Sequence, residues 1–436
     1  MMKIRTLFLA LTGLFLVTLY SSLLNTVFAQ ANVYQHDTIS MESNRTHDVF
    51  YSLKTGDRFQ QLRSNWDIQF STHVMDVTIR TNGAQGVALY AYPNTGISGW
   101  SSMDTTGLSS WPTLNDSDKD WEMGAFNVNG TGSELDYGWG VYSMVSHNIT
   151  GDSLFFIKVP VSATEHFFLK LWIVEKNPVA NKYTFKFANL DGSDETEVVL
   201  NCNDYSSKNF VGYNFKTKAF VDREPASADW DLLFAKYITF YQNVMWYPVT
   251  GALQNYDVEV AAYQLVDTTF MDFTVETFDS ASISTIGNNW FALMGGMPPT
   301  YAITDSLVYF VSDQESSIWK LVFEYYASTE GKIGFRKMLI EDHAGITETP
   351  GVSKGNIAIS PNPATSSTQL LFSADMRGEA EVSVINLTGQ TVYKKNISYV
   401  SGLNTDNIDV TNLPAGVYVV SLKAGNTLLQ NKLIKK

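Results

Sequence analysis

The sequence has little of what catalytic and metal-binding proteins use. Of its 436 residues only one is a cysteine, Cys202, so no intramolecular disulfide can form, and the six histidines are scattered along the chain. It contains no His-Glu-x-x-His, no Gly-x-Ser-x-Gly and no phosphate-binding glycine loop. Because no motif favours catalysis or a metal site, we expect a protein that is not an enzyme.

Long apolar runs are confined to the start of the chain. Lys3 and Arg5 precede an apolar stretch over residues 7–24, and Val27-Phe28-Ala29 offers small residues at a cleavage position. These features predict a secretory signal peptide over residues 1–29. No later stretch is apolar for long enough to span a bilayer, so we expect the mature chain to be soluble.

Positive charge is also in short supply. The formal net charge is −14, and removing residues 1–29 takes away two basic residues and no acid. Residues 357–436 carry seven Lys or Arg and five Asp or Glu, so the negative charge lies in the chain before them. Such a charge repels phosphate backbones, and we expect no nucleic acid partner.

Helical signals are scarce, whereas strand signals recur throughout. Aromatic residues make up 13% of the chain, and the segments SLFFIKV, HFFLKLWIV and KYTFKF combine them with β-branched residues. In MDVTIRTNGAQGVALYAY, apolar residues alternate on both sides of Asn82-Gly83, which predicts a hairpin. The sequence therefore predicts an all-β fold.

An internal repeat becomes visible once the strands are marked. Residues 51–70 and 213–234 both begin Tyr-x-x-Lys-Thr and reach Trp-Asp after a polar loop, which aligns Trp66 with Trp230. Further on, Lys170-Leu171 corresponds to Lys320-Leu321. The order of these landmarks favours a duplication over convergent β patterning. We therefore expect one module over residues 30–195, a second over 196–342, a linker over 343–356, and a third domain over 357–436.

The last domain resembles a known sorting signal. The segments IAISPNPATSSTQLLFS, EVSVINLTGQTVYKKNI and LPAGVYVVSLKAGNTLLQNKLIKK are similar to the type A sorting domain of type IX secretion in Bacteroidota. The resemblance implies an immunoglobulin-like β-sandwich that the outer-membrane translocon reads and removes. The cargo is then released or attached to surface lipopolysaccharide, so we expect a secreted or outer-membrane surface protein of a Gram-negative bacterium. The residues that match the motif are Pro361, Asn362, Pro363, Pro414, Gly416, Tyr418, Lys435 and Lys436.

The two repeated modules resemble HmuY-type heme-binding proteins. The resemblance rests on SNWDIQF followed by DVTIRTNGAQGVALY, and on NNWFALMGGMPPTYAITDSLVYFV in the second copy. It implies heme held between two axial side chains, one of them shortly after a Trp. Met144 and His147 occupy that region after Trp139, and Met294 does so after Trp290. A thioether is a competent axial ligand of heme iron. The nearest second ligands are Met123 in the first copy and Met271 in the second.

Several alternatives stay open at this point. Met between aromatic residues on a strand usually fills gaps in a core. The protein is alternatively a non-catalytic surface adhesin or glycan-binding protein that binds a host glycan or protein, with Trp100, Trp111 and Trp121 as stacking platforms. The acidic run LNDSDKDWE has the alternating carboxylates of a calcium loop but lacks the glycine and the final glutamate, which favours a solvated loop.

Overall fold

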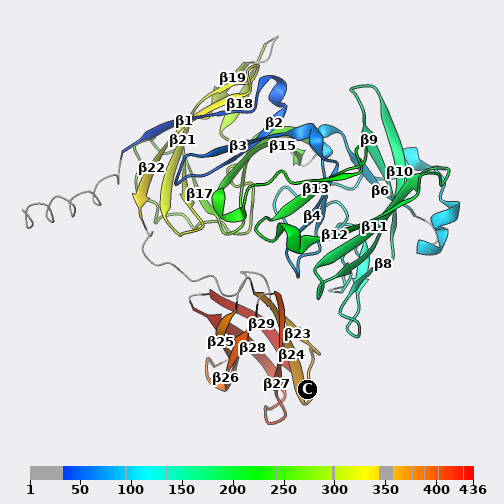
Figure 1. Cartoon of the computed structure of the whole chain (residues 1–436). Helices are drawn as coiled ribbons and strands as arrows, with labels where there is room; N and C mark the ends of the chain where they lie inside the picture. Colours follow the sequence, from blue (N-terminus) through cyan, green and yellow to red (C-terminus); the bar gives the residue numbers. More distant parts are fainter. Residues whose placement is uncertain are drawn as a thin grey trace, which may run out of the picture.

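The protein is described here by a computed structural model that covers most of the chain after the start. It describes residues 33–93, 96–133, 135–241, 244–296, 300–342, 357–374, 377–386, 388–400, 402–425 and 427–436. The predicted signal peptide and linker lie outside these ranges. Within them, antiparallel sheets and short 3-10 helices make up the fold, which confirms the all-β class (Figure 1). None of the helices in these ranges is long and apolar enough to cross a membrane.

The first module consists of one continuous stretch, residues 63–221. Its elements are η2 (Arg63–Asn65), β4 (Ile68–Ser71), β5 (Ile79–Thr81), η3 (Gly83–Gln85), β6 (Ala88–Ala91), η4 (Gly96–Ser102), η5 (Leu108–Ser110), β7 (Gly140–Tyr142), β8 (Ile149–Gly151), β9 (Leu154–Pro160), β10 (His166–Asn177), β11 (Lys182–Asn189), β12 (Thr196–Asn201), η6 (Cys202–Tyr205), β13 (Phe210–Asn214) and β14 (Ala219–Val221). One sheet has the order β12-β11-β10-β8-β7, and β9 joins it by pairing with β10 and β6. The other sheet has the order β14-β13-β4-β5. Their apolar faces enclose a core that includes Trp139, Phe155 and Phe185.

The second module is discontinuous and combines residues 33–62 with residues 222–342. Its elements are β1 (Gln35–Ser40), η1 (Ser43–Arg45), β2 (His47–Tyr51), β3 (Arg58–Leu62), η7 (Ser227–Asp229), β15 (Leu232–Tyr241), β16 (Met245–Gln254), β17 (Glu259–Gln264), β18 (Phe291–Gly295), β19 (Thr300–Ile303), β20 (Leu307–Ser312), β21 (Ile318–Ala327) and β22 (Lys332–Glu341). The sheets β1-β22-β21-β20-β17 and β16-β15-β2-β3 face each other across a second core, and β18-β19 forms a separate hairpin.

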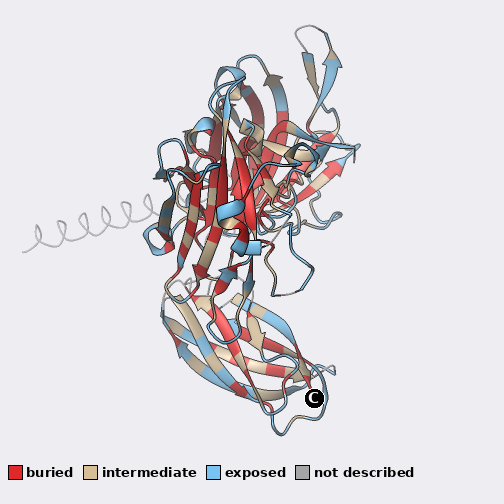
Figure 2. Cartoon of the chain, turned by 90° about the vertical axis from the view of Figure 1, so that its right-hand side faces the viewer, coloured by how far each residue is buried: buried red, intermediate tan, exposed pale blue. Residues whose placement is uncertain are grey.

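The C-terminal domain is a sandwich of two sheets. Its strands are β23 (Ala358–Ser360), β24 (Ser367–Ala374), β25 (Gly378–Asn386), β26 (Thr391–Tyr399), β27 (Gly402–Asp409), β28 (Gly416–Ala424) and β29 (Thr427–Lys435). The order β23-β24-β27 in one sheet and β26-β25-β28-β29 in the other fits the predicted β-sandwich. In all three domains buried residues line the inner faces of the strands, and in the two modules further buried residues lie on an outer face beneath loops, while many turns are exposed (Figure 2).

Each module is completed by a strand and a hairpin that belong to the other copy of the repeat. We call residues 35–62 the first arm and residues 196–221 the second arm. The first arm pairs β1 with β22 and β2 with β15, and the second arm pairs β12 with β11 and β13 with β4. The predicted boundary between residues 195 and 196 therefore does not separate the sheets. The local pattern that predicted it cannot reveal which distant strand edge an arm will pair with.

The Trp-Asp motif of each copy holds the arm of the other copy in place. The backbone N–H of Asp67 donates to Tyr213 O at 2.9 Å, and its carboxylate accepts the N–H of Phe215 at 2.7 Å. Both partners of Asp67, Tyr213 and Phe215, belong to the second arm. Burial raises the pKa of Asp67 to about 6.

The equivalent contacts recur in the second copy with the first arm. The N–H of Asp231 donates to Tyr51 O at 2.8 Å, and its carboxylate accepts the N–H of Leu53 at 2.7 Å. Burial, with a smaller contribution from Asp313, raises the pKa of Asp231 to about 7. The two motifs thus make the same two hydrogen bonds, as the aligned landmarks predict for a duplication.

The predicted hairpin at Asn82-Gly83 is wrong. β5 pairs with β4 and β6 pairs with β9, so the two strands beside this dipeptide do not pair with each other. The buried Asn82 amide instead donates to Arg63 O at 2.7 Å and to Trp66 O at 2.9 Å. Asn255 donates in the same way to the loop before Trp230 in the second copy. The asparagine serves this buried bridge and not a two-residue turn.

The acidic segment 116–122 joins the two modules. Asp116 is half-buried and accepts the N–H of Ala125 at 2.6 Å and that of Thr81 at 3.1 Å, so its carboxylate is held by the protein and the predicted solvated loop is wrong for this residue. Burial raises the pKa of its carboxyl. Asp118 accepts the hydroxyl of Thr239, on β15 of the second module, at 2.5 Å. The segment is a structural bridge and not a calcium loop.

Candidate functional site

The candidate ligands Met144 and Met294 lie on equivalent hairpins. Each hairpin follows a fully buried tryptophan, Trp139 before β7 and Trp290 before β18. Both indole N–H groups donate to backbone carbonyls at 3.0 Å, which fixes the start of each hairpin. In Figure 1 β8, which pairs with β7, lies in the first module, far from the β18–β19 hairpin of the second module. The structure therefore shows two separate tips, one in each module.

The tip of the β7–β8 hairpin brings together the two candidates of the first copy. Met144 is 44% exposed, and Val145 beside it is almost fully exposed. His147 has a positive φ of 58°, and its Nδ1 lies 2.8 Å from the hydroxyl of Tyr142. That contact orients the ring and leaves Nε2 as the nitrogen available to a ligand. Met144 Sδ lies 3.5 Å from Ser360 Oγ of the C-terminal domain.

The tip of the β18–β19 hairpin carries Met294, which is 67% exposed, next to the exposed Leu293. A core-filling role is therefore excluded for Met294, and Met144 is also too exposed for one. The second-ligand candidates are less favourable. Met271 Sδ lies 3.6 Å from the ammonium of Lys320, and Met123 is exposed on a separate loop. No pair of opposed axial ligands emerges from these residues.

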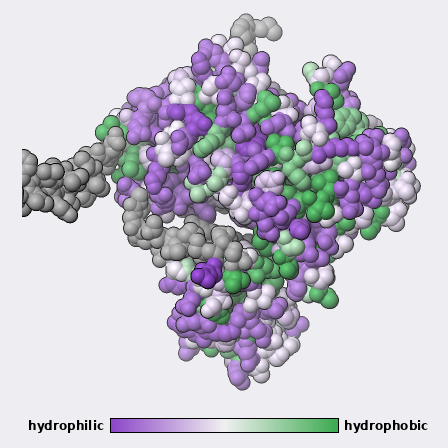
Figure 3. Space-filling view, viewed as in Figure 1, coloured by the Kyte–Doolittle hydropathy of each residue, from purple (hydrophilic) through white to green (hydrophobic). Residues whose placement is uncertain are grey.

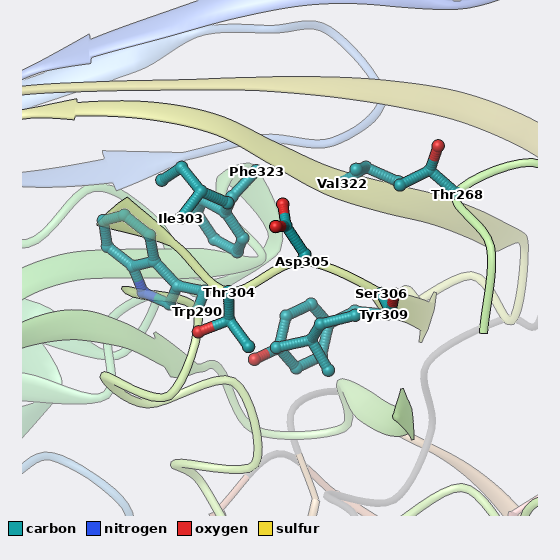
Figure 4. A pocket seen from close by; sticks show the side chains of 10 residues that line it. Thr268, Trp290, Ile303, Thr304, Asp305, Ser306, Tyr309, Val322 and Phe323 are labelled. Atoms are coloured by element: carbon teal, nitrogen blue, oxygen red, sulfur yellow. The ribbon is translucent and has the colours of Figure 1, made fainter. Parts of the chain in front are cut away.

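Enclosed space is small in the described part of the protein. The pocket in Figure 4 has a cavity volume of about 50 Å³ and is lined by Trp290, Ile303, Thr304 and Asp305, among others. A second cavity of about 20 Å³ lies beside Trp121 and Glu224. Ligand pockets for drug-sized molecules measure roughly 300–1,000 Å³. Neither of these two pockets is large enough for a porphyrin.

The predicted stacking platforms are packed into the protein. Trp121 is only 6% exposed, and its indole N–H donates to Gln254 O across the module junction at 2.8 Å, so it is no platform. Trp111 packs against Phe156, and the indole N–H of Trp100 donates to Glu195. These two rings are half-buried parts of the loop that covers β9 and β10. No three His, Cys, Asp or Glu side chains gather as a metal site among the residues that the structure describes.

Sequence reasoning missed the most exposed group of aromatic residues. The ends of β15 and β16 form a hairpin, and we call its described residues 237–241 and 244–249 the aromatic finger. Large apolar side chains at its end are 43–75% exposed: Phe240, Tyr241, Val244, Met245, Trp246 and Tyr247. The signal that could have found it is the complete lack of charged residues from 237 to 256. The face drawn in Figure 3 is mostly hydrophilic, with several separate hydrophobic areas.

The sorting motif lies where the two ends of the C-terminal domain meet. The Asn362 amide donates to Lys432 O at 2.7 Å and accepts the N–H of Ile434 at 2.8 Å, so the Pro-Asn-Pro segment is tied to β29. Pro361 accepts the Thr368 hydroxyl, and Pro363 follows Asn362 directly.

The other half of the motif begins β28. Tyr418 is buried, and its hydroxyl donates to Pro414 O at 2.8 Å, which closes the turn before the strand. Gly416 pairs with Lys435 across β28 and β29. Lys436 extends past the last strand, and its N–H donates to Ala364 O. The motif residues thus form one connected end of the sandwich.

This sandwich is a secretion signal of known type. Residues 358–436 match the family described as the secretion system C-terminal sorting domain. The chain is therefore a cargo of the type IX secretion system, whose translocon processes it, and it is secreted to the cell surface or the medium in Bacteroidota.

Solved structures that resemble the chain include several of low sequence identity. Apo PinO from Porphyromonas gingivitis is 9% identical and covers 71% of this chain and 98% of its own, with a TM-score of 0.27. A putative lipoprotein from Bacteroides fragilis is 12% identical and covers 42% and 95%, with a TM-score of 0.19. A putative HmuY-like heme binding protein from Bacteroides vulgatus is 12% identical and covers 39% and 98%, with a TM-score of 0.17. No curated protein matches the chain. These similarities carry no argument about a ligand.

Proposed function

We propose that the cargo is a non-catalytic binding protein of the cell surface or medium that captures heme at the β7–β8 and β18–β19 tips. The observation that supports this proposal is the exposure of a methionine at the same hairpin in both modules. A soft donor in solvent, held by a hairpin that starts at a buried tryptophan, is unusual for a residue type that normally fills cores.

The chemistry of the donors fits heme. Thioether sulfur and imidazole nitrogen are both axial ligands of heme iron in proteins. In the first copy either Met144 or Nε2 of His147 would supply one axial ligand to the iron, and in the second copy Met294 would do so. The neighbouring side chains Val145 and Leu293 are apolar and exposed, so they can cover part of a porphyrin face. Because neither tip lies in a deep pocket, we expect weaker binding than in an enclosed heme site.

A spectrophotometric titration with hemin, oxidised and reduced, tests the proposal on the secreted protein. We expect a shifted, saturable Soret band at one or two equivalents. Met144→Ala and Met294→Ala should each remove the binding at their own tip, while Met245→Ala, which changes an equally accessible methionine on the aromatic finger, should change nothing. A spectrum identical to that of free hemin, or one that none of the variants alters, would refute heme capture.

The alternative function, adhesion or glycan binding, predicts a different result. Affinity for a host glycan would depend on Trp100 or Trp111 and would be indifferent to Met144 and Met294. Whichever ligand is bound, we propose that the sorting domain leaves the cargo either released or attached to surface lipopolysaccharide.

A further inference from the structure

The aromatic finger extends beyond the sheet that carries it. β15 pairs with β2 only from Leu232 to Phe234, whereas its pairing with β16 continues out to Tyr241 and Met245. Past Phe234 the finger is a two-stranded ribbon, and β16 is the edge strand of its sheet. The first module has no counterpart, because β4 and β5 are only four and three residues long.

Both faces of the ribbon are aromatic. Phe240 and Trp246 are directly paired on one face, with ring centroids 5.2 Å apart. On the other face the rings of Tyr241 and Tyr247 are diagonal neighbours with centroids 6.0 Å apart, and Met245 pairs directly with Tyr241. A sugar-binding platform needs one flat aromatic face. An element that is apolar on both faces can instead be surrounded by an apolar environment on both sides.

The lack of charge on the aromatic finger indicates which kind of surface it can bind. The finger lies within the uncharged stretch from Tyr237 to Tyr256, in a chain with a net charge of −14. Membrane-surface elements that use charge carry Lys or Arg to attract anionic lipids, and this one has none. The acidic remainder of the protein repels anionic surfaces.

We propose that the aromatic finger inserts into the interfacial region of a lipid bilayer with zwitterionic headgroups. Trp and Tyr favour this region because one part of each ring system is apolar and the other is polar. Insertion is shallow, since the outer edges of the ribbon carry backbone groups without ladder partners, and hydrocarbon cannot satisfy them. The finger thereby holds the secreted cargo at a membrane surface, independently of any heme bound at the hairpin tips.

Sedimentation of the secreted protein with phosphatidylcholine vesicles, without hemin, tests this proposal. We expect the wild-type protein to bind, and F240S/W246S to bind about tenfold more weakly because two exposed rings are lost. Leu265→Ser is the matched control, since Leu265 is 94% exposed on a separate loop, and it should bind within about twofold of wild type. Vesicles with added phosphatidylglycerol should bind less protein at low salt.

A second measurement, on a more conservative variant, controls for misfolding of F240S/W246S. Brominated phosphatidylcholine should quench more fluorescence in the wild-type protein than in the conservative variant W246F, which keeps an aromatic ring at this position. Failure of the wild-type protein to sediment with phosphatidylcholine overturns the proposal. So does equal binding by F240S/W246S, or stronger binding to the anionic vesicles.

Discussion

The two cargo modules have the same closing contacts but a different chain path. The first module receives the second arm directly after β11, so the chain simply continues from one strand into the next. The second module receives the first arm from the opposite end of the cargo, where β1 closes onto β22. In both, a Trp-Asp motif fixes the arm with two hydrogen bonds of nearly equal length. The comparison teaches that this closure depends on non-covalent complementarity and not on the connection of the chain.

The outer faces of the modules show a second correspondence. Lys170 and Lys320, which the sequence aligns, are both buried on β10 and β21. The ammonium of Lys170 donates to Trp100 O at 3.1 Å, and that of Lys320 donates to Thr268 O at 2.7 Å. Each acceptor lies in a loop that covers the outer face of the larger sheet. The modules thus use one lysine position to fasten two loops of unrelated sequence.

Removing the first arm should have the largest effect on this comparison. Deletion of residues 33–62 takes five fully buried side chains from the second core, Ile39, Met41, Val49, Tyr51 and Leu53. At roughly 2 kcal/mol for each, the loss is about 10 kcal/mol, which is comparable with the whole stability of a domain. We expect the second module to unfold and the first to stay folded, as measured by hydrogen exchange.

A circular permutant provides the control for this deletion. Moving residues 33–62 to a position after residue 342 restores the same contacts with a local connection, and it should restore protection in β21 and β22. Unchanged protection in these two strands after the deletion would show that the arm does not complete the module.

Replacing each of the two buried aspartates, Asp67 and Asp231, should have an effect of intermediate size on the free energy of unfolding, and this effect should depend on pH. Because their folded-state pKa values, about 7 for Asp231 and about 6 for Asp67, exceed the unfolded value near 4, the folded protein retains protons that the unfolded chain releases. The free energy of unfolding therefore falls as the pH rises through this window. Asp231→Asn should remove on the order of 3 kcal/mol of this fall between pH 5 and 8, and Asp67→Asn about 1 kcal/mol.

Urea denaturation of both variants over that pH range measures the effect. The asparagine oxygen can still accept the arm's N–H, so little change is expected at pH 5. If both variants change the slope of unfolding free energy against pH equally, the two pKa values are raised by the same amount. If neither variant changes that slope, neither carboxyl has a raised pKa.

Replacing the fastening lysines should give the smallest effect. Lys320→Met and Lys170→Met each leave a loop carbonyl without its donor, which costs about 1 to 2 kcal/mol. Hydrogen exchange should become faster only in residues 266–278 for the first and only in residues 96–111 for the second. Lys182→Met, at an exposed position of β11, is the control and should leave both loops unchanged. A global change in exchange would show that the lysines support the sheets and not the loops.

Local pattern was enough to predict the all-β class, but not the pairing of the arms. SLFFIKV, HFFLKLWIV and KYTFKF coincide with β9, β10 and β11 because their side chains meet a buried face. The exchange of arms depends on edges that are distant in sequence, and no local signal encodes them. Trp121 was misjudged for a similar reason, since its hydrogen-bond acceptor, Gln254, lies in the other module.

The sequence predicted where the candidate ligands lie along the chain, but not what surrounds them in the structure. The spacing after Trp139 and Trp290 located Met144 and Met294 on equivalent hairpins, which the structure shows to be exposed. The small volume of the two pockets found in the described part of the chain could not be predicted, because their lining residues come from separate segments. The aromatic finger was overlooked because aromatic residues on a strand usually belong to a core.

The position of the first arm has a consequence for the order of folding during export. Its strands are synthesised first, but their partners β15 and β22 follow only after the entire first module. The second arm, by contrast, begins directly after β11, so the first module has all of its strands before β15 is synthesised. The first module can therefore fold ahead of the second, which stays incomplete until β22 has been made.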